Sequence, residues 1–115
     1  MQQTALSPDF LCDVQPDRDR VIVRLVGELD FAEAPALDAT LHELLEAGFT
    51  RIVVDLRDLR FLDSAGLHRL IVARRAAELR ECTLSLVRGP ENVHRVFELT
   101  ATESLFAFDG AELVP

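Results

Sequence analysis

The stretch with the clearest chemical potential is Asp63-Ser64-Ala65-Gly66-Leu67. It follows Val53-Val54-Asp55-Leu56, which has the composition of a buried strand, and it begins a run with the spacing of an amphipathic helix. The Ser64 hydroxyl is therefore expected in the first turn of a helix, where backbone N–H groups point outward and favour negative charge. A serine in this position either begins the helix or accepts a phosphate, and the helix position alone allows both.

The neighbours of Ser64 raise the alternative of a small serine hydrolase. His68 lies four residues after Ser64, so both side chains share one helix face. However, the segment lacks the first glycine of a nucleophile elbow, and 115 residues are few for a hydrolase. This favours an exposed His68 and a helix-capping role for Asp63. Labelling of Ser64 by a fluorophosphonate would support the hydrolase, and we expect none.

The charge of the chain excludes several other kinds of chemistry. The sequence has 20 acidic and 12 basic residues, a net charge of −8, and every basic residue is arginine. Without lysine there is no Schiff-base, P-loop or receiver-domain lysine. The acidic balance disfavours nucleic acid and anionic lipid, and it favours a protein partner that is basic or of mixed charge.

No cofactor, metal site or membrane segment is expected. His42 and His94 fall on separate predicted helices, and Cys12 and Cys82 match no metal or redox spacing, which is typical of buried thiols. The apolar runs are far too short for a membrane span, and the first residues have no signal-peptide pattern. A soluble cytoplasmic protein is the simplest interpretation.

The order of the predicted elements indicates the fold class. With 49% hydrophobic and 28% charged residues, the chain is expected to form one folded domain over residues 9–115, after a flexible N-terminal tail over residues 1–8. Helices are predicted from near Pro35 to before Gly48, after Asp63 and after Pro90. Strands are predicted at 10–14, 21–29, 51–56, 83–87 and, as a short edge strand, 105–108. A turn is expected at residues 16–19, and both faces of the strand at 21–29 are expected to be largely buried. This order predicts an α/β domain with a mixed, mostly parallel central sheet of about four to five strands and helices packed against it.

Four segments together resemble the STAS domain family, and more narrowly the bacterial anti-sigma factor antagonists. They are Val26-Gly27-Glu28-Leu29-Asp30, Ala34-Pro35-Ala36-Leu37, Asp55-Leu56, and Phe61-Leu62 followed by the Asp63 stretch. The spacing between the Gly-Glu-Leu-Asp and Asp-Ser elements also matches, and the resemblance runs from about Phe10 to Phe108.

The resemblance implies a non-enzymatic partner-switching regulator. Such a protein binds an anti-sigma factor serine kinase when it is unphosphorylated and is released when its serine, here Ser64, is phosphorylated. A serine phosphatase reverses the change, and ATP binds the kinase, so the chain itself needs no cofactor. The implied partner-binding residues are Asp30, Asp63, Ser64, Ala65, Gly66, Leu67 and His68. Asp30 is equally compatible with a helix cap. The alternative within the same family is a constitutive STAS subunit of a transport or signalling scaffold complex, in which Ser64 is never modified.

Overall fold

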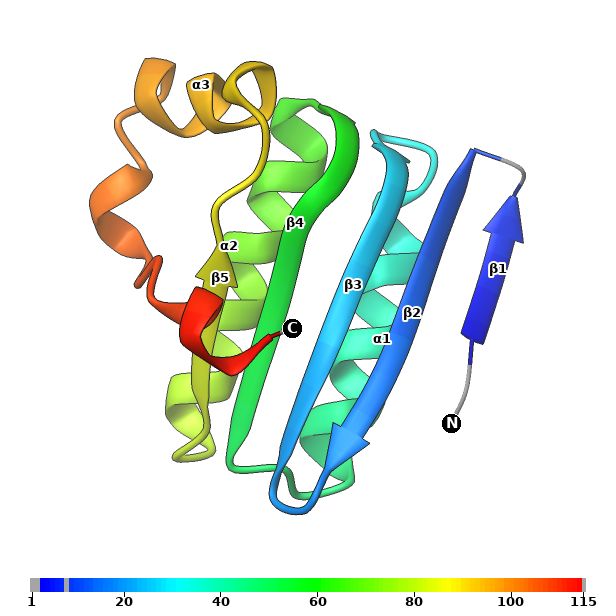
Figure 1. The fold of residues 1–115 in the computed structure, drawn as a ribbon, viewed down its shortest axis with the longest axis vertical. Helices are drawn as coiled ribbons and strands as arrows, with labels where there is room; N and C mark the ends of the chain where they lie inside the picture. The colour runs from blue at the N-terminus through cyan, green and yellow to red at the C-terminus, as the bar shows by residue number, and fades with distance from the viewer. Residues whose placement is uncertain (1–2, 8, 115) are drawn as a thin grey trace.

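The computed structural model describes the backbone of residues 3–7 and 9–114 and the side chains of residues 9–114. It contains five strands and three α-helices (Figure 1). In chain order these are β1 (Gln3–Ser7), β2 (Phe10–Asp17), β3 (Arg20–Leu29), α1 (Ala34–Glu46), β4 (Arg51–Leu62), α2 (Ser64–Leu79), β5 (Thr83–Val87) and α3 (Glu91–Leu99). Two short 3-10 turns follow, at Glu103–Leu105 and Gly110–Leu113.

The strands form one mixed sheet in the order β1-β2-β3-β4-β5. β1 and β2, and β2 and β3, pair antiparallel, whereas β3, β4 and β5 are parallel neighbours. The helices α1 and α2 cross between the parallel strands and lie together on one face of the sheet, behind it in Figure 1. The predicted α/β class and the mixed sheet with parallel central strands are confirmed.

The core lies between this sheet face and the two helices. Alternate residues of β3 point into it, with Val21, Val23 and Leu25 fully buried. The residues between them are only partly buried, so the prediction that both faces of this strand are buried is wrong. The reason is that α1 and α2 cover one face, while the C-terminal turn at Gly110 packs on Val53 and Val87 and leaves the β2–β3 half of the other face open.

Two features near the N-terminus differ from the sequence-based expectation. Residues 3–7, expected in a flexible tail, form β1 along β2, because an edge strand with unpaired N–H and C=O groups is a template for further pairing. Residues 1, 2 and 8 of that predicted tail lie outside the described residues. The expected turn at 16–19 contracts to two residues, since Pro16 continues β2 and pairs with Val21. β1 reaches only as far as Asp13, so the missing N–H of Pro16 costs no pairing on that side.

The predicted edge strand at residues 105–108 is also wrong. Leu105 ends a 3-10 turn, and only Ala107 makes a β-bridge, to Ser85, with its carbonyl accepting the Leu86 N–H at 2.9 Å. Phe106 and Phe108 instead pack edge-to-face on Phe97 of α3, at centroid distances of 5.5 and 5.4 Å. This aromatic contact draws the segment towards α3 rather than along β5.

Other local predictions are confirmed. Pro35 lies in the first turn of α1, and Gly48 follows its end. Cys12 and Cys82 are buried free thiols, and burial raises the pKa of Cys12 to about 12, so this thiol stays protonated and unreactive. No helix in the described part of the chain is long and apolar enough to cross a bilayer.

The end of α3 supplies the first testable prediction. Ala101 has a φ of 57°, a left-handed conformation that closes the helix through its N–H bond to the Glu98 carbonyl at 3.1 Å. A side chain in this conformation is strained, whereas glycine adopts it freely. Ala101→Gly should therefore raise the free energy of unfolding by about 0.5–1 kcal/mol, measured by urea denaturation. Ala39→Gly, in the exposed middle of α1, should lower it by about 1 kcal/mol. A loss of stability in both variants would contradict this account.

Candidate functional site

The two elements that carry the family resemblance lie side by side in the structure. β3 and β4 are parallel neighbours whose last residues, Leu29 and Leu62, are paired in register. Asp30 and Asp63 directly follow them, and the Asp63 N–H donates to the Leu29 carbonyl at 3.3 Å. Because the carboxyl ends of parallel strands meet at one edge of a sheet, residues 33 positions apart in the sequence form one surface.

Asp63 joins the two loops through its carboxylate. Its backbone is extended, and Oδ1 accepts the Gly66 N–H at 2.9 Å, which confirms the predicted N-cap of α2. Its second oxygen, Oδ2, accepts the N–H of Phe31 in the β3–α1 loop at 3.0 Å. One side chain therefore holds both the start of the serine-bearing helix and the neighbouring loop.

Asp30 organises the loop that leads into α1. Its Oδ1 accepts the N–H groups of Ala32 at 3.0 Å and Glu33 at 3.1 Å, and its carbonyl accepts the Ala34 N–H at 2.9 Å. This is a side-chain-to-backbone turn of the kind that aspartate favours before a helix. The N-cap of α1 is Glu33 rather than Asp30, so Asp30 forms the turn before the helix and fixes the path of the loop beside Asp63.

Ser64 is the first residue of α2, and its side chain is exposed. The helix can start this close to the sheet because Gly66 has no side chain. A Cβ at Gly66 would lie 2.8 Å from the Leu29 carbonyl oxygen and 3.0 Å from Leu62 Cδ1. Glycine therefore lets the first helical turn rest on the ends of β3 and β4, and that packing presents the Ser64 hydroxyl to solvent.

The remaining predicted partner-binding residues differ in how far they are buried. His68 is exposed, one turn after Ser64, and Ala65 is half-buried. Within the described residues His68 makes no hydrogen bond to Ser64, so the geometry of a catalytic pair is absent there. Leu67 is only 3% exposed and Gly66 is buried, so these two face the core. Their burial leaves little of their side-chain surface for direct contact with a partner.

An aromatic side chain that the sequence analysis did not select also lies at this site. Phe31 follows Asp30 directly and is 79% exposed. Phe61, near the end of β4, is 45% exposed. Hydrophobic periodicity could not have identified Phe31, because it lies in a loop where that periodicity does not apply.

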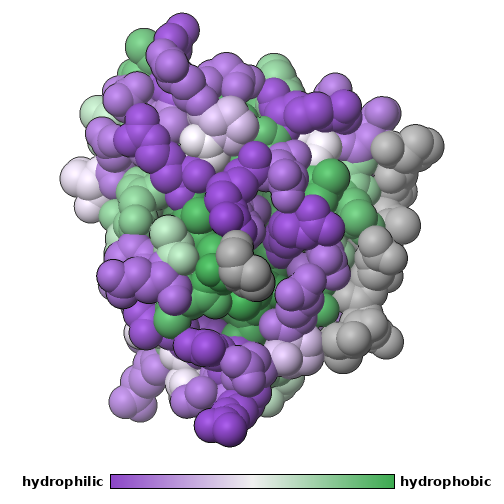
Figure 2. All heavy atoms as spheres, in the orientation of Figure 1, coloured by the Kyte–Doolittle hydropathy of each residue, from purple (hydrophilic) through white to green (hydrophobic). Residues whose placement is uncertain are grey.

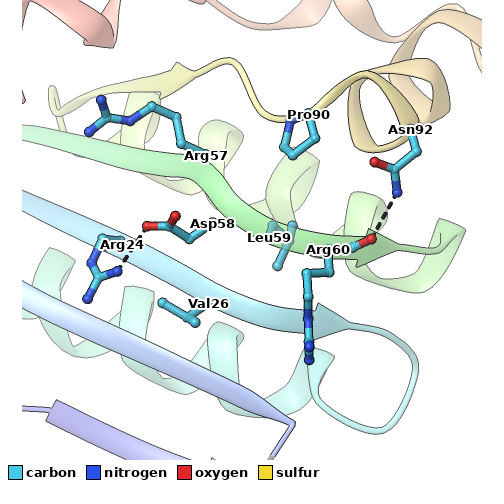
Figure 3. A pocket seen from close by; sticks show the side chains of 8 residues that line it. All are labelled: Arg24, Val26, Arg57, Asp58, Leu59, Arg60, Pro90 and Asn92. Atoms are coloured by element: carbon cyan, nitrogen blue, oxygen red, sulfur yellow. Dashed lines mark hydrogen bonds and ion pairs between the residues drawn. The ribbon is translucent and has the colours of Figure 1, made fainter.

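A hollow lies on the open sheet face (Figure 2). Figure 2 shows apolar side chains in the middle of this face with polar ones around them. The hollow, of about 630 Å³, is drawn in Figure 3. Arg24 donates to Asp58 at 2.9 Å and to Asp13 at 3.2 Å, and these bonds raise the pKa of Arg24. Arg57 makes a two-pronged contact with the buried Asp55 at 3.0 and 2.9 Å. Carboxylates of the chain therefore hold both arginines, while Arg60, which also lines the hollow, lies 4.0 Å from Glu28.

One group of side chains has the composition of a metal site. His94, Glu98 and Glu103 place their ligand atoms within 4.8 Å of one another. The buried His94 Nε2 lies 2.6 Å from Glu103 Oε2, which is the geometry of a hydrogen bond that ties α3 to the following turn. Glu98 and Glu103 are exposed, and this structural tie accounts for the arrangement without an ion.

Comparisons with known proteins agree with this architecture. The family model described as "Mlab, STAS domain" matches residues 12–107. The anti-sigma-B factor antagonist of Staphylococcus aureus strain NCTC 8325 is 28% identical over 83 residues, which cover 72% of this chain and 77% of that protein.

Solved structures show the same fold. An anti-sigma factor antagonist from Mycobacterium paratuberculosis superposes with a TM-score of 0.77 at 23% identity, with 92% of each chain covered. The anti-sigma factor antagonist SpoIIAA in its unphosphorylated form gives a TM-score of 0.72 at 24% identity, covering 83% of this chain and 84% of that one. The phosphorylated form of SpoIIAA, the Bacillus cell fate determinant, gives 0.66 at 22% identity, covering 83% and 87%.

Proposed function

Because the chain belongs to the STAS domain family, and within it to the anti-sigma factor antagonist type, we propose that it is a partner-switching regulator controlled at Ser64. In its unphosphorylated form it binds an anti-sigma factor serine kinase. Phosphorylation of Ser64 by that kinase releases it, and a serine phosphatase restores the binding form. In this cycle the chain is the substrate of the kinase and of the phosphatase, and the kinase binds the ATP.

The observation that supports this proposal most directly is the exposed Ser64 hydroxyl at the start of α2, beside the Asp30 loop. A kinase can reach this hydroxyl without unfolding any part of the domain. The existence of SpoIIAA in phosphorylated and unphosphorylated forms supports the same kind of control. Within the chain, Asp63 and Gly66 hold the serine in place from either side.

Electrostatics explain how one phosphate can switch binding. Phosphorylation adds a charge of about −1.5 to −2 next to the Asp63 carboxylate. The outward N–H groups of the first turn of α2 can stabilise that charge in the free protein. A partner surface that covers a neutral hydroxyl would instead have to desolvate a dianion, which costs several kcal/mol. A loss of about 4 kcal/mol weakens binding roughly a thousandfold.

The proposal is tested by phosphate mapping. The histidine-kinase-like ATPases of the native host are purified, and each is incubated with the chain and ATP before peptide mass spectrometry. We expect one of them to add a single phosphate to Ser64, and Ser64→Ala to abolish the label. A label that persists in Ser64→Ala would contradict the proposal. An unmodified chain that co-purifies stably with a transport or scaffold complex would favour the constitutive STAS subunit instead.

A further inference from the structure

Phe31 exposes a large aromatic ring where folding alone gives no reason for it. Its side chain is 79% exposed, although burying a phenylalanine side chain contributes about 1.5–3 kcal/mol to folding. A single exposed apolar residue is ordinary in itself. Phe31 differs from such a residue because its position is fixed and because it adjoins the proposed phosphorylation site.

The backbone around Phe31 is held by three hydrogen bonds to carboxylates. Its own N–H donates to Asp63 Oδ2 at 3.0 Å. The next two N–H groups, of Ala32 and Glu33, donate to Asp30 Oδ1 at 3.0 and 3.1 Å. A loop fixed in this way loses little conformational entropy when a partner binds, which is the property of a preorganised contact.

The carboxylates bonded to the loop that carries this ring are those of Asp30 and Asp63. From Leu25 to Thr50 the sequence contains six acidic residues and no arginine or lysine. They are Glu28, Asp30, Glu33, Asp38, Glu43 and Glu46. Arginines from β4 and α2 lie near other acidic residues of the segment, with Arg60 4.0 Å from Glu28 and Arg69 4.0 Å from Asp38. Asp63 adds a seventh carboxylate in direct contact with the loop. An apolar ring flanked by the Asp30 and Asp63 carboxylates is complementary to an apolar pocket with a basic rim.

We propose that Phe31 is the aromatic anchor of the kinase-binding surface and enters an apolar pocket rimmed by arginine or lysine side chains on the anti-sigma factor kinase. This inference rests on the proposed function and adds to it the residue that supplies most of the binding energy. Asp63 is the positioning residue, because its two carboxylate oxygens hold the Phe31 backbone and the first turn of α2 in one arrangement. The kinase therefore contacts the anchor and the Ser64 hydroxyl as one surface.

The anchor is tested with Phe31→Ala and the kinase identified by phosphate mapping. Aromatic hot spots lose about thirtyfold or more in affinity when truncated to alanine. We expect calorimetry to show this loss of affinity for Phe31→Ala. The melting temperature of the variant should be unchanged, because the ring is exposed. The matched control is Leu79→Ala, which removes a side chain that is 81% exposed at the far end of α2, and it should leave the affinity unchanged.

The possible results separate this inference from the proposed function. If the wild-type chain binds the kinase and Phe31→Ala binds equally well, the anchor is disproved and the proposed function stands. If the wild-type chain binds none of the host kinases, the proposed function fails and the anchor fails with it. Equal losses in Phe31→Ala and Leu79→Ala would also overturn the anchor, because the effect would then not be specific to this surface.

The positioning role of Asp63 is tested with Asp63→Asn. An amide has one acceptor oxygen, so it can keep only one of the two N–H bonds that the carboxylate accepts. We expect the remaining oxygen to keep capping the helix, so the Phe31 amide should lose protection in hydrogen exchange. The affinity for the kinase should fall about tenfold, because a net hydrogen bond to a charged group corresponds to at least one factor of ten. A Phe31 amide as protected as in the wild type, or an unchanged affinity, would overturn this role.

Discussion

Ser64→Asp is expected to weaken binding to the anti-sigma factor kinase by about a hundredfold or more. The variant places a carboxylate next to Asp63, at a point where the partner would cover a neutral hydroxyl. A charge buried without a partner costs about 3–5 kcal/mol, and each 1.4 kcal/mol is a factor of ten in affinity. The measurement is a calorimetric or surface-binding titration of the purified kinase.

Ser64→Ala is the matched control for charge. It removes the hydroxyl without adding charge, so its affinity should stay within a few fold of the wild type. Both variants should fold normally, because the Ser64 side chain is exposed and the α2 cap is provided by Asp63. Equal affinity of the aspartate and alanine variants would show that charge at this position does not control binding.

Gly27→Ala is expected to lower the free energy of unfolding by about 3 kcal/mol or more, and this loss has two causes. Gly27 has a φ of 102°, which side chains disfavour, and a Cβ there would lie 2.0 Å from the Asp9 carbonyl oxygen. Relief of that overlap requires β2 and β3 to move apart, and overpacking of this kind costs about 1–3 kcal/mol in addition to the strain.

Gly48→Ala separates these two costs. Gly48 has a similar φ of 89°, yet a Cβ there would meet no atom of the described residues within 4 Å. It should therefore lose only about 1 kcal/mol, the cost of the left-handed conformation. Urea denaturation of both variants gives the comparison, and equal losses would rule out the steric cost at Gly27.

The structural role of Gly27 clarifies the Gly-Glu-Leu-Asp element. The Glu28 N–H donates to the Asp9 carbonyl at 2.8 Å, and the register of β3 and β4 shifts between Gly27 and Glu28. The glycine thus allows a close crossing of the chain just before Asp30. The fold therefore requires a glycine at position 27. Gly27 contributes to the partner surface only because it determines where the Asp30 loop begins.

Much of the site could be predicted from the sequence because it depends on regular elements. Two strands connected by a helical crossover must be parallel, and this places Asp30 and Asp63 at the same sheet edge. The cap by Asp63 follows from its position before a periodic helix. The burial of Leu67 also follows from its apolar helical spacing, which places it on the core side of α2, as the structure confirms.

The predictions that were wrong depend on long-range packing. β1 exists because β2 offers an open edge, and no alternation in Gln3–Ser7 signals it. Phe106 and Phe108 follow the aromatic ring of Phe97 rather than strand pairing. Phe31 could not be selected because its significance depends on a backbone bond to Asp63, 32 residues away. The local propensities of the residues do not predict any of these contacts.

The central claim is that phosphorylation of Ser64 alone switches kinase binding. The most direct test compares the calorimetric affinity of the kinase for two samples of one preparation, one unmodified and one phosphorylated completely at Ser64. The account predicts a tight complex with the unmodified chain and an affinity roughly a thousandfold lower for the phosphorylated chain. Equal affinities, or tighter binding of the phosphorylated chain, would contradict it.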